Sequence, residues 1–241
     1  MEYLNKPKQN HRSSYGEGEP REFSVGFIPH KSGTYKIEID SIIESVSQFS
    51  TAIQILECAK EDDEVVIYLQ TDGGSVNAGE AFIHAMRKCS APIHIVATGG
   101  VHSMGTHILL EADSIELSNG FNALIHCGSD GAWGRVNEYR AKTAFDTIFR
   151  DKQFKEAYEG MLSESEIQDV LDGKDIWLDA NGWLDRATAR SEYFKAKYEA
   201  FQAEEDAAEL EEVPVAVVAK KPRKRKTLAI VNKDVDTTPE E

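Results

Sequence analysis

A serine inside a glycine-rich turn gives this sequence its clearest chemical potential. Ser103 stands in the run GGVHSMG at residues 99–105, directly after an apolar segment. A serine nucleophile needs a base for its proton, backbone N–H donors for the developing oxyanion, and a rigid turn that holds its hydroxyl outward. The sequence around Ser103 can supply all three, which favours a serine peptidase.

Two further motifs lie on either side of this turn. The run DGGSV at residues 72–76 places a glycine pair directly after an apolar segment, and the run NALIH at residues 122–126 is an apolar segment that ends in histidine. The pattern indicates turns that follow buried strands. The stretch from Gly73 to His126 is therefore the part around which the rest of the chain is organised.

The elements that must position these residues follow from the apolar periodicity. Strands are predicted at 34–39, 65–69, 93–97, 114–117 and 122–126. Helices are predicted at about 41–60, 79–88, 103–112, 136–162 and 187–201. A further helix is predicted to begin at the capping-box run SESE, residues 163–166. A helix stop is expected at Gly173, an extended segment at 174–178, and turns at 128–134 and 181–182. Strands that alternate with helices predict an α/β fold with right-handed crossovers.

Length and composition limit the class of protein. A chain of 241 residues with 41% hydrophobic residues can bury one sizeable core. No apolar run reaches the length of a membrane span and the N-terminus has no signal-peptide core, so we expect a soluble, cytoplasmic protein. Three cysteines are too few for a disulfide framework and match no zinc pattern. The net charge of −15 argues against general binding to nucleic acid.

The composition predicts one domain between two polar tails. Residues 1–22 lack periodicity and are interpreted as a mobile arm, residues 23–203 as the folded domain, and residues 204–241 as a charged, disordered tail. A basic cluster, KKPRKRK, occupies residues 220–226 of this tail. It either contacts nucleic acid or another acidic surface, or it is a solvated segment that aids solubility.

From about Asp40 to Asp185 the sequence resembles the proteolytic subunit of the Clp protease, a self-compartmentalising serine peptidase. The resemblance is carried by four runs in the family's order: DGGSV at 72–76, GGVHSMG at 99–105, LIH at 124–126 and DIWLDA at 175–180. It implies the ClpP/crotonase fold, a β-α-β superhelix with a protruding handle helix, here with disordered terminal tails.

The resemblance implies which residues carry out catalysis. Ser103 matches the family's nucleophile and His126 matches its general base. His102 is adjacent to the serine, but neighbouring residues on a strand-to-helix turn point apart. His107 lies one helical turn further on and is expected on the helix surface. His126 is therefore the preferred base.

The third member of the implied triad is an aspartate that holds the imidazole tautomer and stabilises its charged form. Asp175 matches that position through the pattern Asp-x-aromatic-Leu. Asp172 and Asp179 lie close by in the sequence and remain alternatives.

The resemblance also implies an oxyanion hole and a substrate-binding strip. Gly74 and Met104 match the positions whose backbone N–H groups bind the oxyanion, and Gly73 shapes the same turn. Ser75 and Val76 match the strip on which the family pairs the substrate backbone as an added strand.

Members of the family act on polypeptides without a cofactor or metal, form stacked heptameric rings, and work with an AAA+ unfoldase. The turn at 128–134 and the helix from Val136 fall where the family's rings stack. The sequence departs from the family pattern at Asp72, where proline is usual, at His102, and in a compressed segment at 179–185. The charged tail also suits a bacteriophage-encoded relative, and some such relatives mature capsids instead of degrading proteins.

Other functions remain open at this point. A crotonase-type acyl-CoA enzyme shares the fold and its oxyanion hole but needs no Ser-His-Asp set. A catalytically silent ring subunit commonly lacks a triad residue, whereas all three are present here. A Ser–Lys dyad needs a suitably placed lysine, and Lys142 is the candidate on the helix that follows.

Overall fold

A parallel sheet built from the predicted apolar runs forms the centre of the molecule. The computed structural model describes residues 23–28, 32–128, 135–210 and 229–230. In spatial order the strands are β1 (Ser24–Ile28), β2 (Thr34–Ile39), β3 (Glu64–Leu69), β4 (Ile93–Ala97), β6 (Ser114–Leu117) and β9 (Ala229–Ile230). Strand β1 is antiparallel to β2, and the other pairs are parallel.

The register of this sheet explains why its strands are apolar. It aligns one isoleucine from each central strand in a single row, and all four are buried: Ile37, Ile67, Ile95 and Ile115. Along β3 and β4 the fully buried residues alternate with neighbours that are less buried, so the row marks the more deeply buried face of the sheet. The row forms the middle of the hydrophobic core.

A second, three-stranded sheet carries the residues of chemical interest. Its strands are β5 (Gly100–His102), β7 (Asn122–Ile125) and β8 (Ile176–Asp179). Strand β7 lies in the middle, parallel to β5 and antiparallel to β8. The carboxyl ends of β5 and β7 and the start of β8 therefore meet at one edge.

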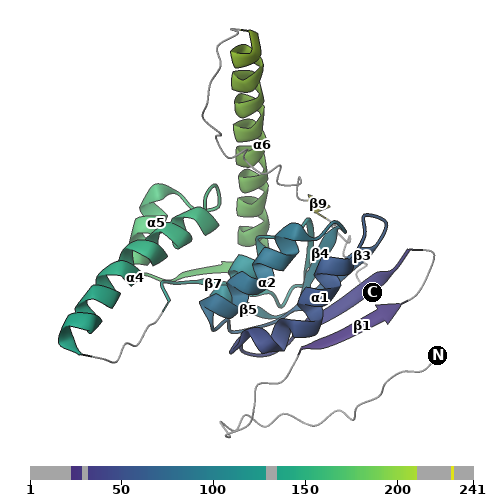
Figure 1. The fold of residues 1–241 in the computed structure, drawn as a ribbon, viewed down its shortest axis with the longest axis horizontal. Helices are drawn as coiled ribbons and strands as arrows, with labels where there is room; N and C mark the ends of the chain where they lie inside the picture. Colours follow the sequence, from purple (N-terminus) through teal and green to yellow (C-terminus); the bar gives the residue numbers. More distant parts are fainter. Residues whose placement is uncertain (1–22, 29–31, 129–134, 211–228, 231–241) are drawn as a thin grey trace, which may run out of the picture.

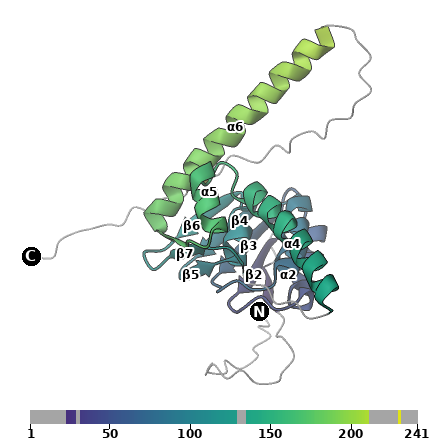
Figure 2. The same cartoon turned by 90° about the vertical axis from the view of Figure 1, so that its left-hand side faces the viewer.

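Helices surround the two sheets. They are the 3-10 helix η1 (Val46–Phe49), α1 (Ser50–Cys58), α2 (Val76–Lys88), α3 (Met104–Leu109), α4 (Val136–Ala157), α5 (Glu164–Leu171) and α6 (Ala180–Leu210). Phe49 of η1 stacks on Phe82 of α2, with ring centroids 4.5 Å apart, and both are buried in the core. Helices α4 and α5 lie to one side of the sheets, and α6 projects away from them (Figures 1 and 2). No helix in the described ranges is long and apolar enough to cross a membrane.

The α/β class and the central strands agree with the sequence prediction, but the first helix begins later than predicted. Residues 41–45 are not helical, because Ile43 forms a β-bridge with Gly74. The Ile43 N–H donates to the Gly73 carbonyl at 2.7 Å. Ser45 is extended, and the helical residues start only at Val46. Ile43 is therefore used to anchor the glycine turn instead of continuing a helix.

The second half of the domain differs from the prediction at three places. Helix α4 ends at Ala157 instead of 162, ahead of Gly160, whose φ is +74°. The turn predicted at 181–182 is helical, because the Asp179 carboxylate accepts the Gly182 N–H at 2.8 Å and starts α6. Helix α6 spans Ala180–Leu210, so it is longer at both ends than the helix predicted at 187–201.

Of the remaining predictions, one is confirmed, some strands were not foreseen, and several segments lie outside the described residues. The capping box is confirmed, since Ser163 and Glu166 exchange hydrogen bonds at the start of α5. The short strands β1, β5 and β9 were not predicted. The expected arm at 1–22, almost all of the turn at 128–134, and the basic cluster at 220–226 lie outside the described residues.

Candidate active site

Ser103 occupies a sharp turn between β5 and α3. Its φ of 52° and ψ of −123° lie in a region that non-glycine residues rarely adopt. The Ser103 N–H donates to the Leu124 carbonyl at 2.8 Å, which ties the turn to strand β7. Ser103 is the N-cap of α3, but its hydroxyl makes no capping bond; the Thr106 N–H bonds the Ser103 carbonyl instead, at 2.9 Å. The hydroxyl is thus not used by the helix.

The second sheet brings the other two predicted triad residues to the same edge. Ile125 at the end of β7 pairs with Ile176 at the start of β8. His126 follows Ile125 and Asp175 precedes Ile176, so the antiparallel register sets His126 and Asp175 opposite each other. Ser103 follows β5 on the other side of β7, next to Leu124. Three adjacent strand ends therefore present a serine, a histidine and an aspartate in that order.

The three residues follow or precede adjacent strand ends, but their side chains are not bonded to one another. In the described part of the chain no hydrogen bond or ion pair is recorded for the Ser103 hydroxyl, the His126 ring or the Asp175 carboxylate. His126 is partly buried and Asp175 is exposed. Catalytic hydrogen bonds are often long before substrate binds. The arrangement therefore permits a triad that tightens on substrate binding or assembly.

The glycine pair of DGGSV packs directly on the serine turn. Gly73 has a φ of +87°, and a Cβ at this position would lie 2.7 Å from Ser103 Cβ and 2.9 Å from Met104 N. Gly74 has a φ of +135°, and a Cβ there would lie 2.1 Å from the Ile43 carbonyl oxygen. Both positions therefore require glycine. Among the described residues the Gly74 N–H has no recorded partner, and Met104 begins α3, where N–H groups lack helical acceptors.

Ser75 and Val76, which the resemblance implied as part of a substrate strip, have roles within the turn itself. The Ser75 N–H donates to the Ile43 carbonyl at 2.7 Å, and the Ser75 hydroxyl caps α2 through Ala78 N at 3.3 Å. Val76 is the first residue of α2. The Ser75 contacts hold the glycine turn to the start of α2, and the assignment of Ser75 and Val76 to a substrate strip stays a prediction.

Two buried side chains that the sequence did not single out support the serine turn. Thr106 Oγ1 donates to the Ser103 carbonyl at 2.6 Å and is 2.5 Å from the hydroxyl of Tyr158. Both Thr106 and Tyr158 are buried. Burial raises the pKa of the Tyr158 phenol above its usual value, so it stays protonated. The spacing from Ser103 to Thr106 could have suggested the first contact, but no sequence signal points to Tyr158.

The two histidines nearest to Ser103 in sequence are engaged elsewhere. The His102 ring lies between Asp72 and Asn122, with Nδ1 3.0 Å from Asp72 Oδ1 and Nε2 2.8 Å from Asn122 Oδ1. His107 was predicted to lie on the helix surface, but it packs edge-on against Tyr158, with 5.0 Å between ring centroids. Burial lowers the pKa of His107 to about 4; the nearby Glu111 carboxylate acts to raise it, and the Arg190 and Arg87 guanidinium groups act to lower it. Neither ring is directed by these contacts at the Ser103 hydroxyl.

Lys142, the candidate for a Ser–Lys dyad, lies within α4. Its ammonium group forms an ion pair with Asp146, one helical turn further along the same helix. The contact is local to α4 and gives no support for a dyad with Ser103.

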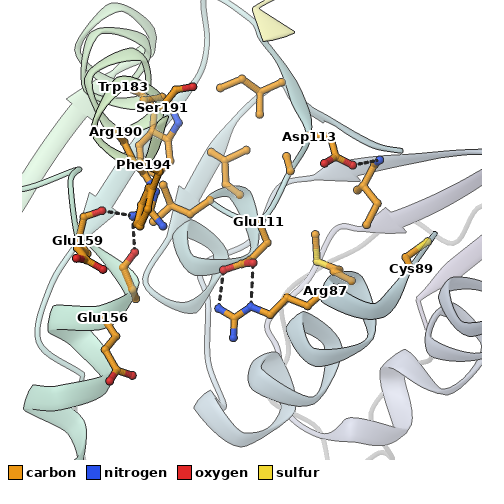
Figure 3. Close-up of a pocket in the computed structure, with 18 of the residues that line it drawn as sticks. Arg87, Cys89, Glu111, Asp113, Glu156, Glu159, Trp183, Arg190, Ser191 and Phe194 are labelled. Carbon is orange, nitrogen blue, oxygen red and sulfur yellow. Dashed lines mark hydrogen bonds and ion pairs between the residues drawn. The ribbon is translucent and has the colours of Figure 1, made fainter. Parts of the chain in front are cut away.

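A cavity of about 820 Å³ lies away from this site, between the core and α6 (Figure 3). Arg87 and Glu111 form a two-point ion pair on one wall, with contacts of 2.9 and 2.6 Å. Trp183 and Phe194 of α6 line the opposite side. None of the three predicted triad residues lines this cavity. Its location therefore separates it from the serine turn.

Comparison of the sequence with known proteins identifies the family to which the chain belongs. The family model for Clp protease matches residues 36–182, which include both sheets' central strands and all three strand ends described above. The chain belongs to the Clp protease family. The match begins in β2 and ends in the first turn of α6, so it contains every candidate site residue.

Individual members of the Clp protease family are more distant. The chain is 31% identical over 120 residues to the ATP-dependent Clp protease proteolytic subunit of Deinococcus radiodurans, covering 48% of this chain and 58% of that protein. It is 26% identical over 115 residues to proteolytic subunit 1 of Prochlorococcus marinus, covering 47% and 59%. A 70-residue match to the Pleurastrum terricola subunit is 34% identical and covers 29% and 36%. The matches thus span less than two thirds of these relatives.

Proposed function

We propose that this chain is a Clp-type serine endopeptidase in which Ser103, His126 and Asp175 form the catalytic triad. The observation that carries the proposal is the order of the second sheet, β5-β7-β8, which presents these three residues at adjacent strand ends. A crotonase-type acyl-CoA enzyme would not require this coincidence. The Ser–Lys dyad is disfavoured by the ion pair of Lys142 with Asp146.

In the proposed reaction Ser103 Oγ attacks the carbonyl carbon of a peptide bond. His126 takes the hydroxyl proton and later delivers it to the leaving amine, while Asp175 orients the imidazole and stabilises its charged form. Water then attacks the acyl-enzyme by the same proton transfers. The strained turn at Ser103 and the uncommitted hydroxyl support the role of nucleophile.

The developing oxyanion is stabilised by the backbone N–H groups of Gly74 and Met104. The close packing of Gly73 on Ser103 and Met104 supports this assignment, since it sets the glycine turn beside the nucleophile. Loss of one such donor typically costs about 10²–10³ in kcat. Glycine at 73 and 74 allows the backbone to approach a substrate without a side chain in the way.

The wider biology of the chain is proposed from the family. The relatives are named as proteolytic subunits of an ATP-dependent protease. We place this chain in the cytoplasm as a self-compartmentalised homo-oligomer of stacked rings that cleaves polypeptides without a cofactor and receives them from an AAA+ unfoldase. The domain limits at 23 and 203, with polar tails on either side, belong to the same proposal.

Labelling with a fluorophosphonate probe tests the catalytic assignment. The probe phosphonylates only an activated serine, so mass mapping should locate the adduct on Ser103. Ser103→Ala should abolish labelling and lower peptide hydrolysis by several orders of magnitude while leaving the fold intact. An acyl-CoA enzyme or a silent ring subunit would remain unlabelled, so absence of labelling at Ser103 would overturn the proposal.

A further inference from the structure

The last strand of the central sheet comes from the C-terminal tail. Strand β9 pairs with β6 in parallel, with Ala229 opposite Ser114 and Ile230 opposite Ile115. In spatial order it follows β6 at the edge of the six-stranded sheet (Figure 1). The three candidate catalytic residues all adjoin strands of the other sheet. This edge therefore belongs to a different sheet from the proposed active site.

The register explains why β6 accepts this segment of the tail. Ile115 belongs to the row of buried isoleucines that crosses the sheet through β2, β3, β4 and β6. Pairing with β9 extends the row by one position, and the residue at that position, Ile230, is again an isoleucine. A strand added to a sheet edge gains affinity from main-chain hydrogen bonds and specificity from the residues at alternate positions. Register and residue type therefore agree on Ile230 as the position that selects this segment.

The contact between β9 and β6 is short. Strand β4 pairs with all four residues of β6, whereas in the described part of the chain β9 pairs with Ser114 and Ile115 alone. Each main-chain hydrogen bond contributes only modestly to net stability, and closing a long connection costs conformational entropy. A free peptide that matches the segment can therefore compete with it for the edge of β6.

The length of the chain allows the segment to reach its own sheet. Helix α6 has 31 residues and is about 46 Å long. Residues 211–228, which connect α6 to β9, can span about 60 Å when extended. The tail can thus return from the end of α6 to β6 of the same chain, which is where the structure places β9. A second copy of the chain is the alternative source of this strand, and cross-linking distinguishes the two.

We propose that the outer edge of β6 is a docking site for an extended apolar peptide, and that the chain's own segment around Ala229 and Ile230 is its resident, displaceable ligand. An open sheet edge presents main-chain groups that can pair with another polypeptide. The resident segment covers this edge, so the site becomes available when the tail is released. The inference goes beyond the peptidase assignment and does not depend on it, since no catalytic step is involved.

Disulfide cross-linking in the full-length protein tests the pairing. Neighbouring strands lie about 4.7–4.9 Å apart, a separation that a disulfide accepts between Cα atoms. Ser114→Cys/Ala229→Cys should therefore link within one chain on mild oxidation, and mass mapping distinguishes this link from any made by the native cysteines. Ser114→Cys/Val235→Cys is the matched control and should link far more slowly. A link between two copies, or equal linking of the control, overturns the inference.

Peptide binding tests whether the segment can be displaced. The probe is a fluorescent peptide of sequence KTLAIVNK, residues 226–233, and its binding to full-length protein is measured by anisotropy. Ala229→Pro/Ile230→Pro removes two successive N–H groups, one of which faces β6 whichever way the strand is turned. If the wild-type segment occupies the edge about 90% of the time, this variant should bind the peptide about tenfold more tightly than wild type.

Two controls complete the binding experiment. Asp234→Pro/Val235→Pro changes the tail outside β9 and should bind the peptide as wild type does. A peptide with prolines in place of Ala229 and Ile230 should bind to none of the proteins. Thermal unfolding verifies that each variant is folded. Equal affinity of the wild type and Ala229→Pro/Ile230→Pro, or no binding to either, overturns the inference and leaves the peptidase assignment intact.

Discussion

The hydroxyl of Tyr158 lies 2.5 Å from Oγ1 of Thr106, and this contact joins the end of α4 to the serine turn. Tyr158 is the C-cap of α4, and Thr106 belongs to α3 and bonds the Ser103 carbonyl at 2.6 Å. Two hydrogen bonds thus connect the helix proposed to take part in assembly with the proposed nucleophile. The connection is buried, so water does not compete for it.

Removing the Tyr158 hydroxyl should weaken this connection. Tyr158→Phe keeps the ring in the core and deletes one hydrogen bond, so unfolding free energy should fall by about 1 kcal/mol. We also expect severalfold slower labelling of Ser103, because the turn loses part of its support. Tyr193→Phe is the matched control, since its hydroxyl bonds Glu159 at an exposed site and makes no recorded contact with the serine turn. Equal labelling of the two variants would show that Tyr158 acts on stability alone.

The two histidines near the serine should respond differently to mutation. His126→Ala should lose several orders of magnitude in peptide hydrolysis, because it removes the proposed general base. His102→Ala should retain substantial activity, within about tenfold of wild type. A greater loss in His102→Ala than in His126→Ala would move the base to His102.

Disruption of α4 should affect both assembly and activity. Ala144 lies in the interior of this helix, and its side chain is exposed. Ala144→Pro should destabilise α4 by about 3 kcal/mol or more, because proline removes a helical hydrogen bond and clashes with the preceding turn. Ala144→Ser is a mild control. Size-exclusion chromatography with light scattering measures the oligomer, and a monodisperse wild-type monomer with full peptidase activity would rule out the proposed ring.

His107 should make stability depend on pH. Its pKa in the folded protein is about 4, against an ordinary value of 6.5, because burial disfavours the charged ring. Between these values the unfolded chain binds a proton that the folded chain does not. Stability should therefore be greatest above pH 6.5 and fall by about 1–3 kcal/mol as the pH decreases towards 4. In His107→Leu, urea denaturation should show a smaller dependence over this window; an unchanged slope would contradict the assignment.

The central strands could be predicted from the sequence because buried parallel strands are short, continuous apolar runs. β3 and β4 show this pattern clearly. β5 could not be predicted, since its three residues GVH lie in a glycine-rich turn without periodicity. The start of α6 was also missed, because the Asn181-Gly182 pair is typical of a turn unless a side chain such as Asp179 caps a helix before it.

For the candidate site, the sequence motifs indicated which residue types come together but not their contacts. Ser103, His126 and Asp175 were chosen by resemblance, and their catalytic roles stay predictions. The contact of Tyr158 with Thr106 joins residues 52 positions apart, and that of Asp72 with His102 joins residues 30 apart. Such pairs depend on the sheet register and on the end of α4, which local patterns do not encode.

The backbone at Ser103 has a consequence for how this chain changes over generations. Ser103 is the one non-glycine residue in the described ranges with a positive φ, a conformation that costs about 1–3 kcal/mol. Glycine would adopt it without that strain, so drift towards thermal robustness alone would favour glycine at this position. Substitution by glycine would relieve the strain and remove the hydroxyl, so stability and chemistry place opposite demands on this position.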